Sequence, residues 1–245
     1  MLNDLLLLSK NDIPFPEGQL VIHTPTIKEI GLIGEENFFM GCEMLNFSKD
    51  NLNIEDKSVL EQMSDFDILM QIMLQQDSTL QKTKISVYLL FSLLFPNYQM
   101  SITQQGFTFV KEEDGKEAYI NNKNFSAFKE LITKMFCLQK NGEKEDYNPG
   151  GDLARQIADK LKKRHQKLAE LSGSQKISIF SRYISILSIG MNIGINELLE
   201  YSVYQLFDTF TRYELKISYD TYVQAKMAGA KDIKEPDNWM KDIHS

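Results

Sequence analysis

The sequence predicts an α+β protein that is predominantly helical, with a small antiparallel β-meander in the N-terminal half and a helical C-terminal half. Three observations support this fold class. Apolar residues recur at helical spacing through most of the chain, short alternating segments gather between residues 98 and 120, and the chain after residue 151 shows helical periodicity alone. A chain of 245 residues, 42% of them hydrophobic, is long enough to bury a substantial core.

Capping and turn residues place the boundaries of the expected elements. Thr26 and Glu29 match the capping box, in which each side chain satisfies the backbone N–H of the other residue, and Ser64 with Asp67 repeats the pattern. An Asp-Gly pair at 114–115 suits a tight hairpin turn. The expected helices are 26–32, 35–46, 57–76 with a restart at Ser64, 79–95, one from caps at 121–124 to 135, 152–171, 176–188, 196–216 with Asn196 as its cap, and 218–227. The expected strands are 20–22, which follows breaks at Pro14 and Pro16, then 98–102, 107–110 and 116–120.

A polar, glycine-containing segment divides the chain. Residues 141–151 hold an Asn-Gly pair, a charge cluster and an Asn-Pro-Gly-Gly run, a composition typical of a loop or hinge. The sequence therefore predicts a mixed helical and β-meander domain at 1–140, a linker at 141–151, and a helical domain with a polar tail at 152–245.

The overall charge argues against nucleic acid as a partner. The formal net charge is −7 and the sequence pI is about 5.1, whereas phosphate binding needs concentrated Lys and Arg. The basic run at 160–167 is the exception, but an apolar stripe that begins at Leu153 and Ile157 leaves the basic residues on what looks like a solvated helix face. A nucleic-acid-associated regulator that uses this basic helix remains an alternative.

No membrane association and no disulfide is expected. The longest apolar stretches, such as 87–95, are much shorter than a membrane span, and the leucine run at 5–8 is too short for a signal sequence. Cys42 and Cys137 lie among apolar neighbours and are expected to be buried small hydrophobes. We therefore expect a cytoplasmic protein.

The residues that usually perform chemistry are scattered. His23, His165 and His244 show none of the spacings of a metal site, and the glycine clusters lack the pattern of a phosphate-binding loop. Carboxylates at helix starts are favourable with the helix dipole and need no further role. The sequence predicts no catalytic residue, no metal site, no cofactor and no enzyme, although an enzyme with an unfamiliar site remains an alternative.

Aromatic residues are the best candidates for partner binding. Tyr204 and Phe207 belong to an aromatic stripe along 201–213 that core packing explains first and a partner groove explains second. Trp239 and Met240 are large apolar residues near the end of the chain, where they either dock back on the helical half or anchor a partner. The candidate partner-binding residues are Trp239, Met240, Tyr204 and Phe207.

One segment resembles a known group of proteins. Residues 25–39 read Pro-Thr-Ile-Lys-Glu-Ile, then Ile-Gly-Glu-Glu and Phe-Phe, which resembles the opening of tailed-phage tail assembly chaperones and related tail-region proteins of Gram-positive hosts. The helical half, with its closing Asn-Trp-Met at 238–240, is similar in general character. The resemblance implies a factor that binds the tape-measure protein before the tail tube forms around it. Phage or other assembly proteins are then the partners, a homo-oligomer is a further option, and a structural tail or connector subunit of the virion is the alternative.

Overall fold

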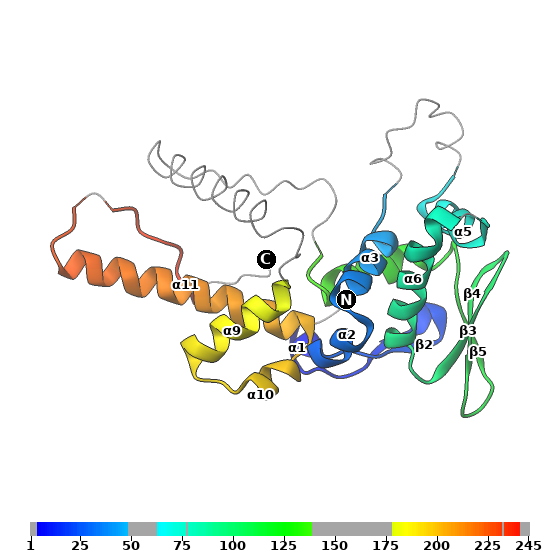
Figure 1. Cartoon of the computed structure of the whole chain (residues 1–245), viewed down its shortest axis with the longest axis horizontal. Coiled ribbons are helices and arrows are strands. Elements are labelled where there is room, and N and C mark those ends of the chain that lie inside the picture. Colours follow the sequence, from blue (N-terminus) through cyan, green and yellow to red (C-terminus); the bar gives the residue numbers. More distant parts are fainter. Residues whose placement is uncertain (1–3, 49–62, 77, 139–177, 232, 241–245) are drawn as a thin grey trace.

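The fold is described here from a computed structural model, shown in Figure 1. It describes residues 4–48, 63–76, 78–138, 178–231 and 233–240. The predicted linker at 141–151, the predicted helix at 152–171 with its basic run, and the first part of the helix expected at 57–76 lie outside the described residues. The described helices are α1 Asp4–Leu8, α2 Ile27–Ile33, α3 Glu35–Leu45, α5 Asp65–Leu74, α6 Gln81–Leu94, α7 Phe125–Met135, α9 Ile179–Met191, α10 Ile195–Leu199 and α11 Val203–Met227. The strands are β1 Ile13–Phe15, β2 Leu20–Ile22, β3 Tyr98–Thr103, β4 Gly106–Lys111 and β5 Glu117–Ile120, and two short 3-10 turns are η1 Pro16–Gly18 and η3 Ser78–Leu80.

The predicted fold class is confirmed. Helices dominate, and both antiparallel sheets lie in the N-terminal half. One sheet pairs β1 with β2, and the other is the predicted meander in the order β3-β4-β5. Phe109 on the central strand lies opposite Met100 on β3 and Ala118 on β5. Figure 1 shows the meander at one end of the molecule and α11 projecting from the other end.

Both predicted capping boxes are confirmed. The backbone N–H of Thr26 donates to Glu29 Oε2 at 2.7 Å, and the N–H of Glu29 donates to Thr26 Oγ1 at 3.1 Å. Ser64 and Asp67 make the same reciprocal pair at the start of α5. These bonds satisfy N–H groups that a helix start otherwise leaves without a partner.

Two expectations about the chain path were wrong. The sequence predicts breaks at Pro14 and Pro16, but Pro14 lies within β1 and pairs with Val21 of β2. A two-stranded ribbon has only edge strands, where a missing N–H is tolerated. The helix expected to begin at Asn196 begins instead with a capping box of Ser202 and Gln205, after the short separate helix α10.

The division expected near residue 217 is also absent, because α11 runs unbroken for 25 residues. Lys216 Nζ donates to Asp220 Oδ2 at 2.7 Å, one turn along the helix. This i,i+4 ion pair spans Ser218 and supports the helix where the sequence suggested a new start.

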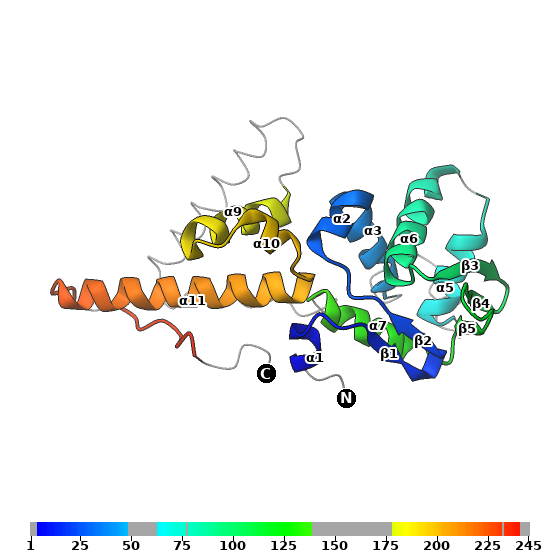
Figure 2. The same ribbon diagram turned by 90° about the horizontal axis from the view of Figure 1, so that it is seen from below.

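The core is one continuous cluster that reaches from the meander to the C-terminal helices. At the sheet end, Phe107 and Phe109 of β4 pack their rings against Phe91 of α6 at centroid distances of 4.8 and 5.7 Å. Next to it, α3 packs closely on α6, where Gly41 leaves room for Leu90. Figure 2 shows α2, α3 and α6 side by side between the meander and α11.

An aromatic joint connects the N-terminal helices to α9. Phe38 of α3 is fully buried, and its ring lies 4.9 Å from Phe136 and 6.0 Å from Phe180 of α9. Glu35 Oε1 accepts a hydrogen bond of 2.7 Å from the backbone N–H of Ile179, so α3 caps the first turn of α9. The division of the chain into two domains stays a prediction, and the described parts on either side of it share this core.

Candidate functional site

Helix α9 has apolar residues on two opposite faces. Its inner face buries Phe180, Ile184 and Leu187, which follow the i, i+4, i+7 spacing of a helix packed on a core. Its outer face carries Ile179, Ile186 and Ile189, with 38%, 38% and 87% of each residue exposed. We call these last three residues the isoleucine face. A helix that is apolar on both sides is normally covered on both sides, so this face is a candidate site for a partner.

The geometry of α9 follows from its spacing and its contacts. Ile186 and Ile189 lie seven and ten positions after Ile179, so all three fall on one side of the helix, with Arg182 between them. The guanidinium of Arg182 lies 5.5 Å from the ring centre of Tyr183. The sequence reasoning missed this site, although isoleucines at these spacings within an otherwise buried pattern were a readable signal.

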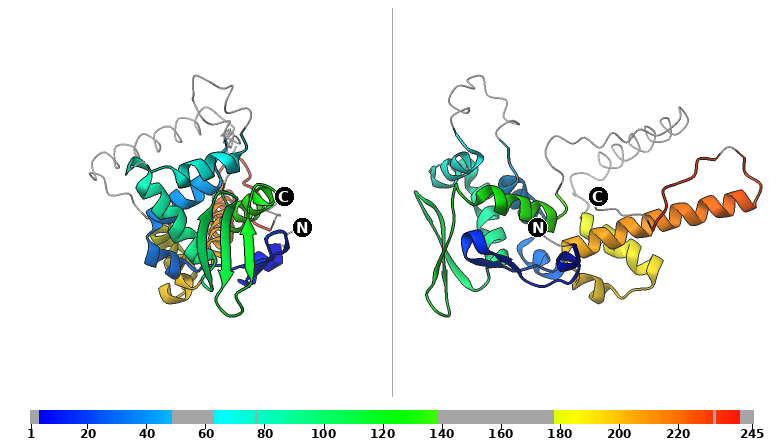
Figure 3. Two further views of the ribbon diagram at one scale, coloured as in Figure 1. Left: turned by 90° about the vertical axis from the view of Figure 1, so that its right-hand side faces the viewer. Right: turned by 180° about the vertical axis from the view of Figure 1, so that it is seen from behind.

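Exposed apolar residues continue beyond α9. Met191 and Ile195 flank the turn between α9 and α10, and both are exposed. Along α11 the buried residues end at Phe210, and the following helix carries exposed Ile217 and Met227. Figure 2 and Figure 3 show this second part of α11 extending away from the body of the molecule. An extended helix with apolar side chains offers a further surface to a protein partner.

The four predicted partner-binding residues fall in two places. Tyr204 is buried, and Phe207 is half-buried with its ring 5.3 Å from Tyr183 and 6.3 Å from Phe180. Trp239 is half-buried and Met240 is 69% exposed, in the segment that follows α11 and reverses direction (Figure 1). The first two thus add to the core beneath α9, and a role in partner binding for all four residues stays a prediction.

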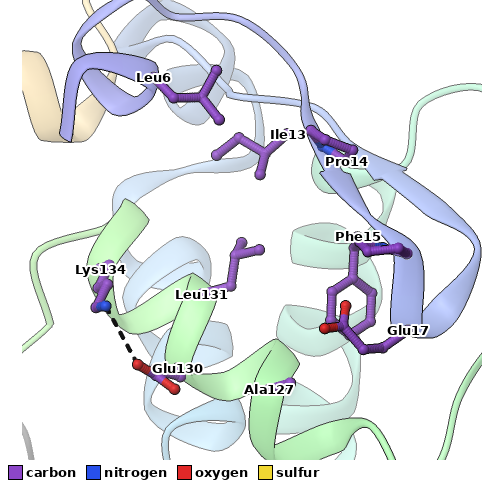
Figure 4. A pocket seen from close by; sticks show the side chains of 10 residues that line it. Leu6, Ile13, Pro14, Phe15, Glu17, Ala127, Glu130, Leu131 and Lys134 are labelled. Atoms are coloured by element: carbon purple, nitrogen blue, oxygen red, sulfur yellow. Dashed lines mark ion pairs between the residues drawn. The ribbon is translucent and has the colours of Figure 1, made fainter. Parts of the chain in front are cut away.

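A second candidate site is a hollow of about 490 Å³ between β1 and α7 (Figure 4). The side chains of Leu6, Ile13 and Leu131 point toward its centre. Lys134 and Glu130 lie at its rim and form an ion pair of 3.3 Å. The apolar centre of the hollow can accept an apolar side chain.

His23 has a carboxylate beside each of its two ring nitrogens. Its Nδ1 lies 3.0 Å from Asp12 Oδ1, and its Nε2 lies 3.3 Å from Glu29 Oε1. Burial raises the pKa of Glu29, but the hydrogen bonds from Thr26 and the attraction of His23 outweigh it, so this pKa lies below its ordinary value. Because Glu29 also caps α2, the contacts among Asp12, His23 and Glu29 connect the ends of β1 and β2 to the start of α2. Among the described residues, no group of three or more His, Cys, Asp and Glu side chains could hold a metal ion.

The two cysteines differ, which corrects the expectation that both are buried. Cys42 is buried in α3, and burial raises the pKa of its thiol well above its ordinary value. Cys137 is exposed just after α7, where a φ of 52° turns the chain. None of the helices in the described ranges is long and apolar enough to cross a membrane.

Comparison with known proteins relates the C-terminal part of the chain to a phage family. Residues 174–244 match a family model described as the YomV second domain, and that name derives from a Bacillus phage. The matched segment contains α9, α10 and α11, and therefore the isoleucine face. Comparisons with curated proteins and with solved structures gave no match. The helices that carry the exposed apolar surface are thus similar to a phage-derived domain.

Proposed function

We propose that the protein is a non-enzymatic phage assembly factor, a tail assembly chaperone that holds the tape-measure protein before the tail tube forms. The isoleucine face carries this proposal, because three β-branched apolar side chains on the solvent side of a packed helix have no role in the core. The phage-derived family model covers the same helix. The resemblance of residues 25–39 to tail assembly chaperones supports the finer assignment.

The chemistry of this surface suits a helical partner. Exposed residues at positions 179, 186 and 189 form a ridge along α9, and an amphipathic helix can pack its own apolar stripe against such a ridge. Tape-measure proteins are extended, so a chaperone must shield apolar helical segments until assembly. Exposed Met191 and Met227 add flexible side chains that adapt to different partner sequences.

Co-purification tests the proposed contact. The full chain is co-expressed with a candidate tape-measure protein, and the amount of bound partner is measured for Ile186→Lys, Ile189→Lys and the double variant. We expect each single variant to lose about tenfold in affinity, since an interface residue of this kind contributes on the order of 1–2 kcal/mol. Ser181→Lys is the matched control, because it adds the same charge to an exposed position of α9 that lies on another side of the helix from Ile186 and Ile189. Equal losses in control and test variants would contradict the proposal.

Mass spectrometry of purified particles separates a chaperone from a virion subunit. A chaperone leaves the assembly, so we expect the protein in infected cells and not in finished particles. Stoichiometric presence in particles would instead identify a structural tail or connector subunit.

A further inference from the structure

The three-stranded meander has one edge that the protein covers itself. Asn124 Nδ2 donates to the carbonyl oxygen of Tyr119 on β5 at 2.8 Å and to that of Glu17 at 3.1 Å. A Cβ atom added to Gly18 would lie 2.9 Å from Tyr119 O, so turn η1 sits directly against β5. The chain thus closes this edge with a turn and with the asparagine that precedes α7.

The opposite edge, β3, is open among the described residues. The backbone groups of successive residues point alternately to the two sides of a strand. The N–H of Lys111 donates to Lys116 O, so Lys111 faces β5. Its neighbour Val110, which pairs with Gln99, therefore faces β3. The register therefore turns Gln99, Ser101 and Thr103 of β3 toward β4. Met100 and Ile102 turn their N–H and C=O groups outward, and no other described strand pairs there.

This open edge also lacks the usual protection. Exposed edge strands normally carry Lys or Pro, or a bulge, that prevents pairing with another chain. β3 reads Tyr-Gln-Met-Ser-Ile-Thr, six residues without a charge or a proline, and it pairs with β4 without a bulge. The described part of the chain thus covers one edge of the meander and leaves the other edge, which carries neither a charge nor a proline, without a partner strand.

An apolar groove lies beside the same edge. A hollow of about 470 Å³ runs between α6 and β3, and Ile85, Tyr88 and Leu89 of α6 form one wall. Tyr98 and Met100 of β3 form the other wall, and both are half-buried. Met100, whose backbone groups face outward, is thus also a residue whose side chain lines the groove.

We propose that β3 and this groove bind an extended segment of a partner polypeptide, which adds a fourth strand to the meander. The backbone of the segment pairs with Met100 and Ile102, and its apolar side chains at alternate positions fill the groove beside Tyr88. The occupant is an uncharged, β-prone stretch with large apolar residues at every second position. This surface is separate from the isoleucine face and does not depend on the proposed function.

A second copy of the chain is a poorer occupant. In a symmetric pair of β3 strands, each copy would bring the side chains of Tyr98, Met100 and Ile102, which already pack against their own core. They are not free to fill the groove of the other copy, whereas a separate segment brings its own side chains.

Synthetic peptides of the same length as β3 test the proposal on the full chain. Their residues alternate between threonine and valine, leucine or phenylalanine, and control peptides carry proline at the paired positions. We expect the alternating peptides to slow amide hydrogen exchange at Met100 and Ile102 by about tenfold or more, and the proline peptides to have no effect. Failure of every alternating peptide to protect these amides would overturn the proposal.

Two tyrosine variants locate the peptide. Tyr88 in the groove and Tyr119 on β5 are each 43% exposed, so Tyr88→Ala and Tyr119→Ala remove the same side chain at the same burial. We expect Tyr88→Ala to weaken peptide binding by about tenfold and Tyr119→Ala to leave it unchanged. Circular dichroism confirms that both variants fold. Equal effects of the two variants would refute the proposal and indicate non-specific binding. Amide protection at Met100 that rises with protein concentration, and not with peptide concentration, would refute it and indicate self-pairing.

Discussion

Two glycines offer the same chemical change with opposite expected signs. Gly31 lies inside α2, and a Cβ atom added there would meet nothing within 4 Å. Gly41 lies inside α3, and its added Cβ would lie 2.8 Å from the backbone oxygen of Ser86 and 3.0 Å from Leu90 Cβ. Substituting alanine at each position therefore separates helix propensity from the close packing of α3 on α6.

The magnitudes follow from these distances. Alanine is favoured over glycine in a helix interior by about 0.8–1.0 kcal/mol, so Gly31→Ala should raise the free energy of unfolding by roughly that amount. Gly41→Ala makes the same gain in helix propensity, but overpacking typically costs about 1–3 kcal/mol. We expect a cost of about 2–3 kcal/mol here, because a backbone atom of α6 must move. We expect Gly41→Ala to lower the free energy of unfolding by about 1–2 kcal/mol.

Urea denaturation of the two variants measures this difference. Circular dichroism follows the helices, and an unchanged slope with urea shows that the variants differ in stability and not in compactness. The expected gap between the two variants is about 2–3 kcal/mol. Two changes of the same sign would refute the close contact between α3 and α6.

Three further substitutions test the core, the cap and the meander. Phe38→Ala removes a fully buried ring from the aromatic joint and should lower the free energy of unfolding by about 3–5 kcal/mol. Calorimetry measures this loss, and an exposed control substitution should cost less than about 1 kcal/mol. The folded-state pKa of Glu29 is lowered, so its stabilisation is present above its unfolded pKa, near 4.5, and is lost as pH falls through the folded value. Glu29→Gln keeps a cap and should flatten the loss of thermal stability on acidification, whereas an unchanged acid profile would exclude this role. Gly106→Ala should destabilise the hairpin strongly, because φ is +139° and the added Cβ would lie 2.4 Å from Ile120 O; near-native melting would contradict that geometry.

Local signals in the sequence predicted the local structure well. The capping boxes at Thr26 and Ser64 and the alternating segments of the meander mark their elements without help from the rest of the chain. Pro14 misled because proline is normally read as a break, and only the pairing with Val21 makes it an edge-strand residue. Ser218 misled for the same kind of reason, since the ion pair across it is formed only within the long helix.

The candidate site could be predicted only in part. A helix over 176–188 was expected from its periodicity, and α9 lies there. Which of its two apolar faces is buried depends on Phe38 and on α11, which are distant in sequence. The isoleucine face is therefore a property of tertiary packing. In the same way, contacts distant in sequence decide the edges of the meander: Asn124 and η1 cover β5, and no strand in the described ranges pairs with the outer side of β3.

Site-specific photo-crosslinking in infected cells tests the central claim most directly. A photoreactive benzoylphenylalanine replaces Ile189 on the isoleucine face in one variant and Ser181, on another side of the helix, in the control, and both positions are exposed on α9. We predict that position 189 crosslinks to the tape-measure protein during tail assembly and that position 181 does so weakly. Equal crosslinking from both positions, or crosslinks from 189 to every protein but the tape-measure protein, would contradict the account.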